Sequence, residues 1–364
     1  MKCIRWGLIG AGHVAQDHCR AIQDLAGNGF ELLAVADVDP GRAAATAQRW
    51  TIPRVYSDYR EMLSREDIDA VIVATYSQAH RAPVIDALAA GKHVMVEKPM
   101  AGTLDDALQI ARAARLSESL LMVAQKWRFA PEYQALDAII ETGMLGDIYY
   151  AECNVARRWG IPGRSESLSG SLIGKETAGL GVMGDFGVYG IDMVLRNLGY
   201  PRPTAVSAVA NNLLGKTNAP ASGSTWGWTS SQLDVEDFAV TSIRVETGAL
   251  ILLKTAWIMH MDELGSDLMY LGTKGGAKVT SSGLTIFRCE AGLLTDSRPP
   301  QLDQVEGIEL FRREHLAFAD AIRERRPSPV PADRFLLTNV IVDAAMRSVA
   351  AGREVEVSIP AEFA

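Results

Sequence analysis

The 364-residue sequence predicts an α/β domain with a parallel sheet, followed by an α+β domain with a large, mostly antiparallel open sheet. Up to about residue 125, short apolar runs alternate with segments of helical periodicity, which is the pattern of repeated βα units. After Pro131, alternating apolar and polar stretches follow one another without regular helices between them. We therefore place the domains at 1–127 and 128–364 and expect the C-terminal helix to pack back near the first domain.

The elements of the first domain follow from these runs. The predicted strands are IRWGLIG, ELLAVA, AVIVAT, HVMV and LLMVA. Asp39 and Pro40 form an N-cap and first-turn pair for the helix that follows. Gly91 ends another helix, and Thr103 with Asp106 resembles a capping box.

The second domain begins with a predicted helix, EYQALDAIIETG. The predicted strands after it are IYYAECNVA, AVSAVA, FAVTSIRVE, ALILLKTAWIM and LTIFR. Further helices are expected near 184–198, 311–323 and 331–351, and a short strand near 355–359. Stretches near 215–231 and 295–303 are rich in Gly, Ser and Pro and are predicted loops.

Composition narrows the class of protein. A formal net charge of -8 provides no basic field for nucleic acid or anionic membranes, so a small molecule is the expected partner. The sequence shows no signal-peptide pattern, and we expect a cytoplasmic location. Four cysteines lie far apart without a Cys/His cluster, which favours reduced thiols over a disulfide framework and predicts no metal site.

A glycine-rich turn directly follows the first predicted strand. Gly10, Gly12 and Ala15 form a G-x-G-x-x-A pattern, and His13 and Val14 complete the turn. The first glycine permits the tight turn, the second lets a pyrophosphate approach the backbone, and the small third residue lets helix and strand pack closely. This is the pattern of a Rossmann dinucleotide-binding domain.

Asp37 ends the second predicted strand, where a carboxylate accepts hydrogen bonds from an adenosine ribose. A carboxylate repels a 2'-phosphate, and the next residue is Val38 rather than arginine. These residues favour NAD over NADP, although NADP stays open. The alternative is that Asp37 is an ordinary turn residue.

The carboxyl ends of parallel strands share one edge of the sheet, where ligands bind. Besides Gly10 and Asp37, the predicted residues at this edge are Thr75, Tyr76, Glu97, Lys98 and Gln125. Lys98 therefore lies where a nicotinamide would sit, unless it is a structural lysine with an internal partner. Glu97 is expected to contact the cofactor, and Arg128 to line the cofactor site or the domain junction. The Lys98–Pro99 bond is a candidate for a cis peptide.

The segment 184–198 places Asp185, Tyr189, Asp192 and Arg196 on one predicted helical face. Gly184, Gly187 and Gly190 are unfavourable in a helix by about 1 kcal/mol each relative to alanine. Something must therefore approach this backbone closely. The alternative is an amphipathic helix with a solvated polar face.

Taken together, the GLIGAG start, the strand-end EKP and the later GxGxxxDxGxY segment resemble the Gfo/Idh/MocA oxidoreductases, and the similarity runs to GREVEVSI. The resemblance implies that Lys98, Asp185 and Tyr189 are catalytic and that Asp192 contacts substrate. Tyr189 stands where most members have histidine, as in the glucose-fructose oxidoreductase and dihydrodiol dehydrogenase branches, which tend to use NADP. The family's TPNxxH segment reads TYSQAH here, so His80 is kept. The later segment RRWGIPG resembles the inositol and sugar dehydrogenase branches.

The resemblance implies an NAD(P)-dependent dehydrogenase that transfers a hydride between a sugar or polyol and nicotinamide. Free Lys and Tyr have pKa values of about 10.4 and 10, so a base at neutral pH needs a lowered pKa. We expect a protonated Lys98 to lower the pKa of Tyr189. Lys98 and Tyr189 would then hold the reacting oxygen and relay its proton, while Asp185 orients them.

Further polar and aromatic side chains suit a polyhydroxylated ligand. They are Arg157, Arg158, Trp159, Lys175, Glu176, Trp226 and His260. Two other functions stay open: redox-neutral glycoside cleavage through a transient keto sugar, and a non-enzymatic dinucleotide sensor. An exposed sheet face in the second domain would favour a homodimer or homotetramer.

Overall fold

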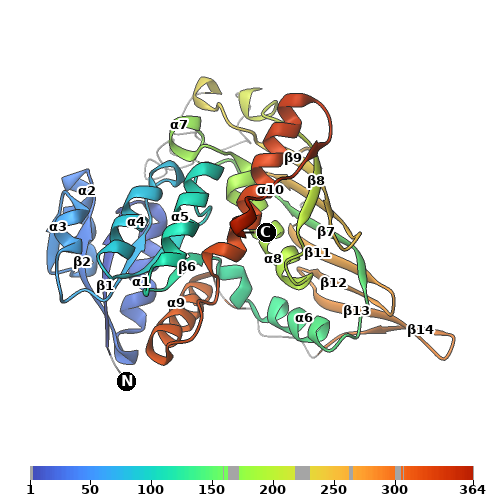
Figure 1. Ribbon diagram of the computed structural model, residues 1–364, viewed down its shortest axis with the longest axis horizontal. Coiled ribbons are helices and arrows are strands. Elements are labelled where there is room, and N and C mark those ends of the chain that lie inside the picture. Colours follow the sequence, from blue (N-terminus) through green and yellow to red (C-terminus); the bar gives the residue numbers. More distant parts are fainter. Residues whose placement is uncertain are drawn as a thin grey trace.

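The computed structural model describes residues 3–158, 160–162, 172–217, 230–261, 265–299, 305 and 307–363. It contains two sheets that lie beside each other, with helices between them (Figure 1). The first is a six-stranded parallel sheet in the order β3-β2-β1-β4-β5-β6. Its strands are β1 (Ile4–Ile9), β2 (Phe30–Ala36), β3 (Arg54–Tyr56), β4 (Ala70–Val73), β5 (His93–Glu97) and β6 (Leu121–Ala124).

The helices of this half connect the strands as the sequence predicts. They are α1 (His13–Asp24), α2 (Pro40–Trp50), α3 (Tyr59–Leu63), α4 (Arg81–Ala89) and α5 (Leu104–Leu116), with short turns η1 (Ala26–Asn28), η2 (Ser77–Ala79) and η3 (Lys126–Phe129). The Asp39 side chain accepts hydrogen bonds from the backbone at Gly41 and Arg42 and so caps α2. Thr103 accepts one from Asp106 N and caps α5. The predicted caps are therefore confirmed.

The second sheet has nine strands in the order β14-β13-β12-β11-β7-β10-β9-β8-β15. Only β7 and β10 pair in parallel, so the sheet is mostly antiparallel. The strands are β7 (Ile148–Ala156), β8 (Pro203–Asn211), β9 (Phe238–Val245), β10 (Leu250–Ala256), β11 (Gly265–Gly272), β12 (Gly276–Thr280), β13 (Gly283–Glu290), β14 (Leu293–Ser297) and β15 (Val355–Glu356). These two sheets confirm the predicted fold class.

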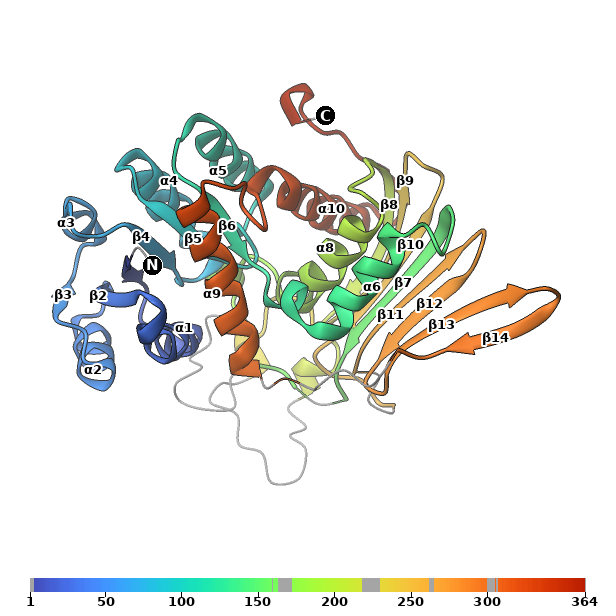
Figure 2. The same cartoon turned by 90° about the horizontal axis from the view of Figure 1, so that it is seen from below.

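Among the described residues, the helices cover one face of the second sheet (Figure 2). They are α6 (Pro131–Glu141), α8 (Val188–Asn197) and α10 (Ala332–Ala351). α6 contacts β12 and β13, α8 contacts β7 and β10, and α10 contacts β8. A Cβ on Gly190 would collide with Cys153 Sγ of β7. The predicted close approach to this backbone is therefore made by the sheet. The other face carries the exposed apolar side chains Val209, Val240, Phe287 and Leu294.

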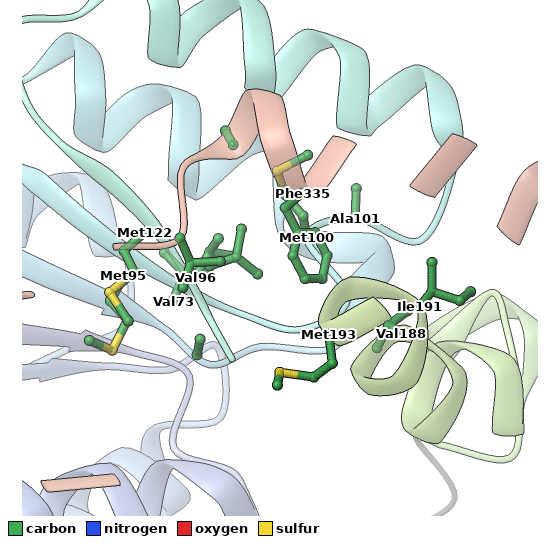
Figure 3. Close-up of a cluster of buried hydrophobic side chains, with 14 of the residues drawn as sticks. Val73, Met95, Val96, Met100, Ala101, Met122, Val188, Ile191, Met193 and Phe335 are labelled. Carbon is green, nitrogen blue, oxygen red and sulfur yellow. The ribbon is translucent and has the colours of Figure 1, made fainter. Parts of the chain in front are cut away.

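The last helices connect the two sheets. α9 (Gly307–Glu324) packs against α1 and η3, and α10 also packs against α5 and β6. Figure 3 shows the apolar core at this junction, where side chains from the first sheet meet α8 and α10. The labelled residues are Val73, Met95, Val96, Met100, Ala101, Met122, Val188, Ile191, Met193 and Phe335.

The segment predicted as a helix over 184–198 begins differently. Met183–Gly187 is a π-helix (η4), and α8 continues from it. Upstream lies the short α7 (Lys175–Ala178), and the loops contain η5 (Gly215–Thr217), η6 (Ser230–Gln232) and η7 (Ala361–Phe363). The predicted loops at 215–231 and 295–303 fall partly outside the described residues. The stretch Lys175–Asn197 is long and apolar enough to cross a membrane, but 83% of its apolar 18-residue window is buried inside the protein, as in a core helix.

Candidate active site

A cavity of about 850 Å³ runs along the carboxyl ends of the first sheet and continues to η4 and α8. Many of the predicted site residues line it. From the cofactor set these are Gly10, Gly12, His13, Val14, Asp37, Val38, Thr75, Tyr76, His80, Glu97 and Lys98, and from the substrate set they are Arg157, Asp185 and Tyr189, with Lys98 common to both. The cavity thus joins the glycine-rich turn to the second half of the chain.

The two glycines of the turn meet different surroundings. Gly10 has φ +93°, and a Cβ there would lie 2.7 Å from the Ala74 carbonyl oxygen, so only glycine fits. A Cβ on Gly12 would meet no atom within 4 Å. The space beside Gly12 opens at the N-terminus of α1, where backbone N–H groups favour an anion. This arrangement fits the pyrophosphate of a dinucleotide. Ala15 is fully buried, does not line the cavity and permits close packing of α1.

Asp37 is held at the cavity rim by backbone groups. Its Oδ2 accepts from Ala11 N at 2.7 Å and its Oδ1 accepts from Asp39 N at 2.9 Å. Each oxygen keeps a further lone pair for a ligand. The next side chain, Val38, is 92% exposed and brings no cation to this position. The geometry therefore presents a carboxylate where an adenosine ribose would bind.

Lys98 follows β5 and reaches the π-helix. Its Nζ donates to Asp185 Oδ1 at 2.6 Å and to the Asp185 carbonyl oxygen at 2.9 Å. Asp185 Oδ2 accepts from Trp257 Nε1 at 2.9 Å. Burial raises the pKa of Asp185, but the charge and hydrogen bond of Lys98 and the Trp257 indole outweigh burial and hold it below the usual value. Asp185 is therefore a carboxylate at neutral pH.

Tyr189 lies against this pair through its ring. Lys98 Nζ is 4.8 Å from the ring centroid, and Trp127 stacks at 4.4 Å. Because Trp127 occupies one face of the ring, Lys98 occupies the other. Burial, followed by the charges of Glu97, Glu314 and Asp185, raises the pKa of Tyr189 well above its usual value. The expected lowering by Lys98 is wrong, and Tyr189 stays a neutral phenol at physiological pH.

Asp192 and Arg128 do not line the cavity. They form a buried ion pair in which Arg128 Nε donates to Asp192 Oδ2 at 2.7 Å and Nη2 donates to Oδ1. Arg128 also donates to the Pro329 carbonyl oxygen. The buried pair places neither side chain for its predicted contact, of Asp192 with substrate and of Arg128 with the cofactor. The reason is that α8 passes against η3, so the turn after Tyr189 meets Arg128 instead of open space.

Other predicted residues also lie elsewhere. Gln125 is buried outside the cavity lining, and its Nε2 donates to the Val188 carbonyl oxygen at 3.4 Å. Lys175 and His260 are exposed and do not line the cavity. Trp159 and Trp226 fall outside the described residues.

His80 and Glu97 are cavity residues that are nearly buried. The ring nitrogens of His80 lie 3.0 Å from the Pro99 carbonyl oxygen and 3.1 Å from the Thr75 carbonyl oxygen, so the ring joins two strand ends. Glu97 Oε2 accepts from Lys98 N at 3.0 Å. The Lys98–Pro99 peptide is cis.

The sequence predictions missed several residues of the cavity and its support. Trp257 follows β10 and orients Asp185, while Lys126, Leu180, Phe186 and Phe311 line the cavity. Trp257 stood within the stretch ALILLKTAWIM, but its indole partner lies 72 positions away in sequence. No local pattern marks such a contact.

Comparisons with known proteins agree with this architecture. Residues 4–125 match the model described as "Oxidoreductase family, NAD-binding Rossmann fold", and residues 133–278 match the GFO/IDH/MocA C-terminal domain. The chain is 28% identical to D-glucoside 3-dehydrogenase of Escherichia coli, over 97% of both chains. It is 38% identical to inositol 2-dehydrogenase of Acidothermus cellulolyticus over 146 residues, which are 40% of this chain and 42% of that relative.

Solved structures show the same fold. Levoglucosan dehydrogenase in complex with NADH and L-sorbose has a TM-score of 0.85 at 24% identity, over 99% of this chain and 100% of that one. An oxidoreductase from Agrobacterium radiobacter in complex with NAD+, L-tartaric acid and magnesium has a TM-score of 0.79 at 22% identity, over 97% and 98%. The two family models, which together span most of the chain, and the dinucleotide cavity lead to one conclusion: this chain belongs to the Gfo/Idh/MocA family of NAD-binding oxidoreductases.

Proposed function

We propose that this protein is an NAD-dependent dehydrogenase of a sugar or polyol, with residues 1–127 binding the dinucleotide and 128–364 supplying the substrate side. Relatives named for glucoside and inositol oxidation support this substrate class. The cavity supports it as well, because charged donors and acceptors stand beside the aromatic faces of Trp127 and Phe186. A polyhydroxylated ring needs both kinds of contact.

The observation that carries the proposal is the geometry of Lys98. An ammonium has three N–H donors, and two of them bind Asp185. The third position of Nζ, an N–H in the ammonium and a lone pair in the neutral amine, is left for the cavity, which Lys98 lines. Lys98 is therefore placed to hold the oxygen of a carbinol at the carboxyl edge of the first sheet, where a nicotinamide would lie.

NAD, held along the cavity by the turn at Gly10 and Gly12 and by Asp37, would supply the acceptor for the hydride of the carbinol carbon. In the oxidising direction, the Lys98 amine takes the hydroxyl proton and becomes the ammonium that Asp185 stabilises; in the reducing direction, the same ammonium returns it. Tyr189 keeps its own proton and acts as a hydrogen-bond donor to the reacting oxygen. Trp257 Nε1 keeps the Asp185 carboxylate in place, and the Asp185 carbonyl oxygen accepts from Lys98 Nζ and keeps the lysine beside it.

Replacement of Lys98 by methionine tests this role. We expect kcat to fall by roughly 10³-fold or more, since removal of a general base costs about 10²–10⁴-fold. The affinity for NAD is expected to stay within a few fold, because the turn at Gly10 and Gly12 is unchanged. A Lys98→Met enzyme with near-normal kcat would overturn the proposal.

A second question is whether the reaction produces NADH or cleaves a glycoside without net redox change. It arises because a relative named for glucoside oxidation makes a glycoside a candidate substrate. We propose to offer inositols, aldoses, anhydrosugars and glycosides with NAD and with NADP, and to follow absorbance of the reduced nicotinamide. Accumulating NADH supports the dehydrogenase. Release of the aglycone without NADH supports redox-neutral glycoside cleavage instead.

We also propose a homodimer or homotetramer assembled through the uncovered face of the second sheet. On this face Val209, Val240, Phe287 and Leu294 are 65%, 38%, 40% and 89% exposed. Exposed apolar groups on one sheet face favour burial against another subunit. A monomer by light scattering at micromolar concentration would contradict this. The free thiols Cys3, Cys19, Cys153 and Cys289 support action in a reducing compartment such as the cytoplasm.

A further inference from the structure

A buried chain of polar side chains lies behind Lys98 and is not explained by the chemistry above. Glu97 Oε1 lies 3.0 Å from His18 Nε2, and His18 Nδ1 lies 3.0 Å from His315 Nε2. Both imidazoles are fully buried, and Glu97 is 7% exposed. The three side chains come from β5, α1 and α9, so the chain joins residues 297 positions apart.

The hydrogen positions follow from the partners. Glu97 Oε2 already accepts from Lys98 N, and His18 holds Oε1. The carboxylate accepts only, so His18 Nε2 carries the hydrogen and its Nδ1 is an acceptor when the ring is neutral. His315 Nε2 must then donate to His18. The tautomer of His18 is thus set by Glu97 and that of His315 by His18. The bond from His315 holds the His18 ring in place, and His18 in turn orients Glu97.

We propose that His18 and His315 are positioning residues for Lys98, acting through Glu97, which holds the Lys98 backbone N–H beside the cavity. This inference rests on the proposed role of Lys98. Glu97 lines the cavity while its support lies outside it. An outer partner that fixes the ring of an inner histidine commonly changes activity without touching substrate.

The surroundings show that packing alone does not account for these polar groups. His315 Nδ1 and both carboxyl oxygens of Glu314 are buried without a hydrogen-bond partner among the described residues. Each such group disfavours folding, and apolar side chains of similar size would pack here at lower cost. Trp6 already contacts the His315 ring edge-on at a centroid distance of 5.5 Å. A histidine in this apolar environment is therefore better explained by its bond to His18.

A matched set of α9 variants separates positioning from folding. His315→Phe removes the donor to His18, whereas His315→Gln keeps an amide N–H where Nε2 lies. Phe318→Leu alters a fully buried α9 side chain that packs on Trp6 and makes none of the hydrogen bonds of this chain. We expect His315→Phe to lower kcat roughly tenfold, with KM values for NAD and sugar within about threefold, as for loss of one hydrogen bond to a charged network. His315→Gln is expected to restore most of kcat.

The pH profile provides a readout that a purely structural role would not move. Burial raises the pKa of the Glu97 carboxyl. The hydrogen bond and charge of His18 and the charges of Lys98 and Lys126 outweigh burial and keep this pKa below its usual value. Glu314 faces Glu97 from α9. Loosening His18 raises that pKa, so the acidic limb of the kcat profile is expected to move to higher pH in His315→Phe. His18→Asn loses the Nε2 donor to Glu97, and the acidic limb of its kcat profile is expected to move to higher pH as well.

The outcomes are distinct. A tenfold loss in His315→Phe or His18→Asn, rescue by His315→Gln and normal kcat in Phe318→Leu support the inference. Unchanged kcat and pH profile in His18→Asn, or an equal loss in Phe318→Leu, would overturn it, even if His315→Phe fails to fold. Normal kcat in Lys98→Met would instead reject the proposed function, whatever the histidine variants show.

Discussion

Replacing Asp192 by asparagine tests whether this carboxylate supports the fold or binds substrate. Asp192 and Arg128 are 1% and 4% exposed in their side chains, and the guanidinium donates from Nε and Nη2 to the two carboxylate oxygens. The variant keeps the shape but leaves Arg128 as a buried cation without its counter-charge. We expect the free energy of unfolding to fall by about 3–5 kcal/mol, the usual cost of removing one partner of a buried pair.

For a chain of 364 residues, this loss corresponds to a fall in Tm of about 4–6 °C. Scanning calorimetry provides the measurement. Arg347→Met is the matched control, because Arg347 on α10 pairs with Asp343 at 2.9 Å, but the two side chains are 49% and 35% exposed. A partly exposed pair contributes about 0–1 kcal/mol, so we expect a small change in Tm. The double variant Arg128→Met with Asp192→Leu is expected to recover part of the stability, since no buried charge remains.

Kinetics then decide the role of Asp192. Because Asp192 does not line the cavity, the KM for sugar and kcat of Asp192→Asn are expected to stay within about twofold at 20 °C, where the protein is folded. A KM raised more than about tenfold, with Tm unchanged, would refute this reasoning. It would mean that Asp192 contacts substrate, as the family resemblance first implied.

Three further results are expected. Tyr189→Phe is expected to lower kcat by about 10–100-fold, measured in steady state, because the neutral phenol donates a hydrogen bond to the reacting oxygen. Gly12→Val is expected to abolish NAD binding in calorimetric titrations with little change in Tm, whereas Gly10→Ala is expected to lower Tm, because φ is +93° and Ala74 O blocks a Cβ. Burial raises the pKa of Asp237 to about 6, so its contribution to stability is lost as pH rises through 6. The fall in Tm between pH 4 and pH 7, which spans the ordinary carboxyl pKa and the raised one, is expected to be smaller in Asp237→Asn; an equal fall would contradict this.

The sequence alone predicted the parts of the fold whose causes are local. The N-cap at Asp39, the turn at Gly10 and the apolar runs of the first sheet all depend on residues adjacent in the chain. Lys98 and Asp37 were also placed correctly at the cavity, because every parallel strand presents its carboxyl end to the same edge.

Helical spacing was less reliable near the second half of the site. It placed Asp185, Tyr189 and Asp192 on one face, but the π-helix and the contact of α8 with η3 separate their roles. Asp185 and Tyr189 reach the cavity, whereas Asp192 meets Arg128. Periodicity shows which side chains share a face of a helix but not what packs against each turn of that face.

Tertiary structure also decided the charge states. The pKa of Tyr189 depends on burial and on the charges of Glu97, Glu314 and Asp185. Of these three carboxyl groups, only Asp185 lies near Tyr189 in the sequence. The bond from His315 to His18 exists only because α9 returns to pack on α1. The sequence determined which chemical groups the protein carries and which sheet edge presents them. Only the packing of distant elements decided which of these groups meet, because desolvation and pairing act through space rather than along the chain.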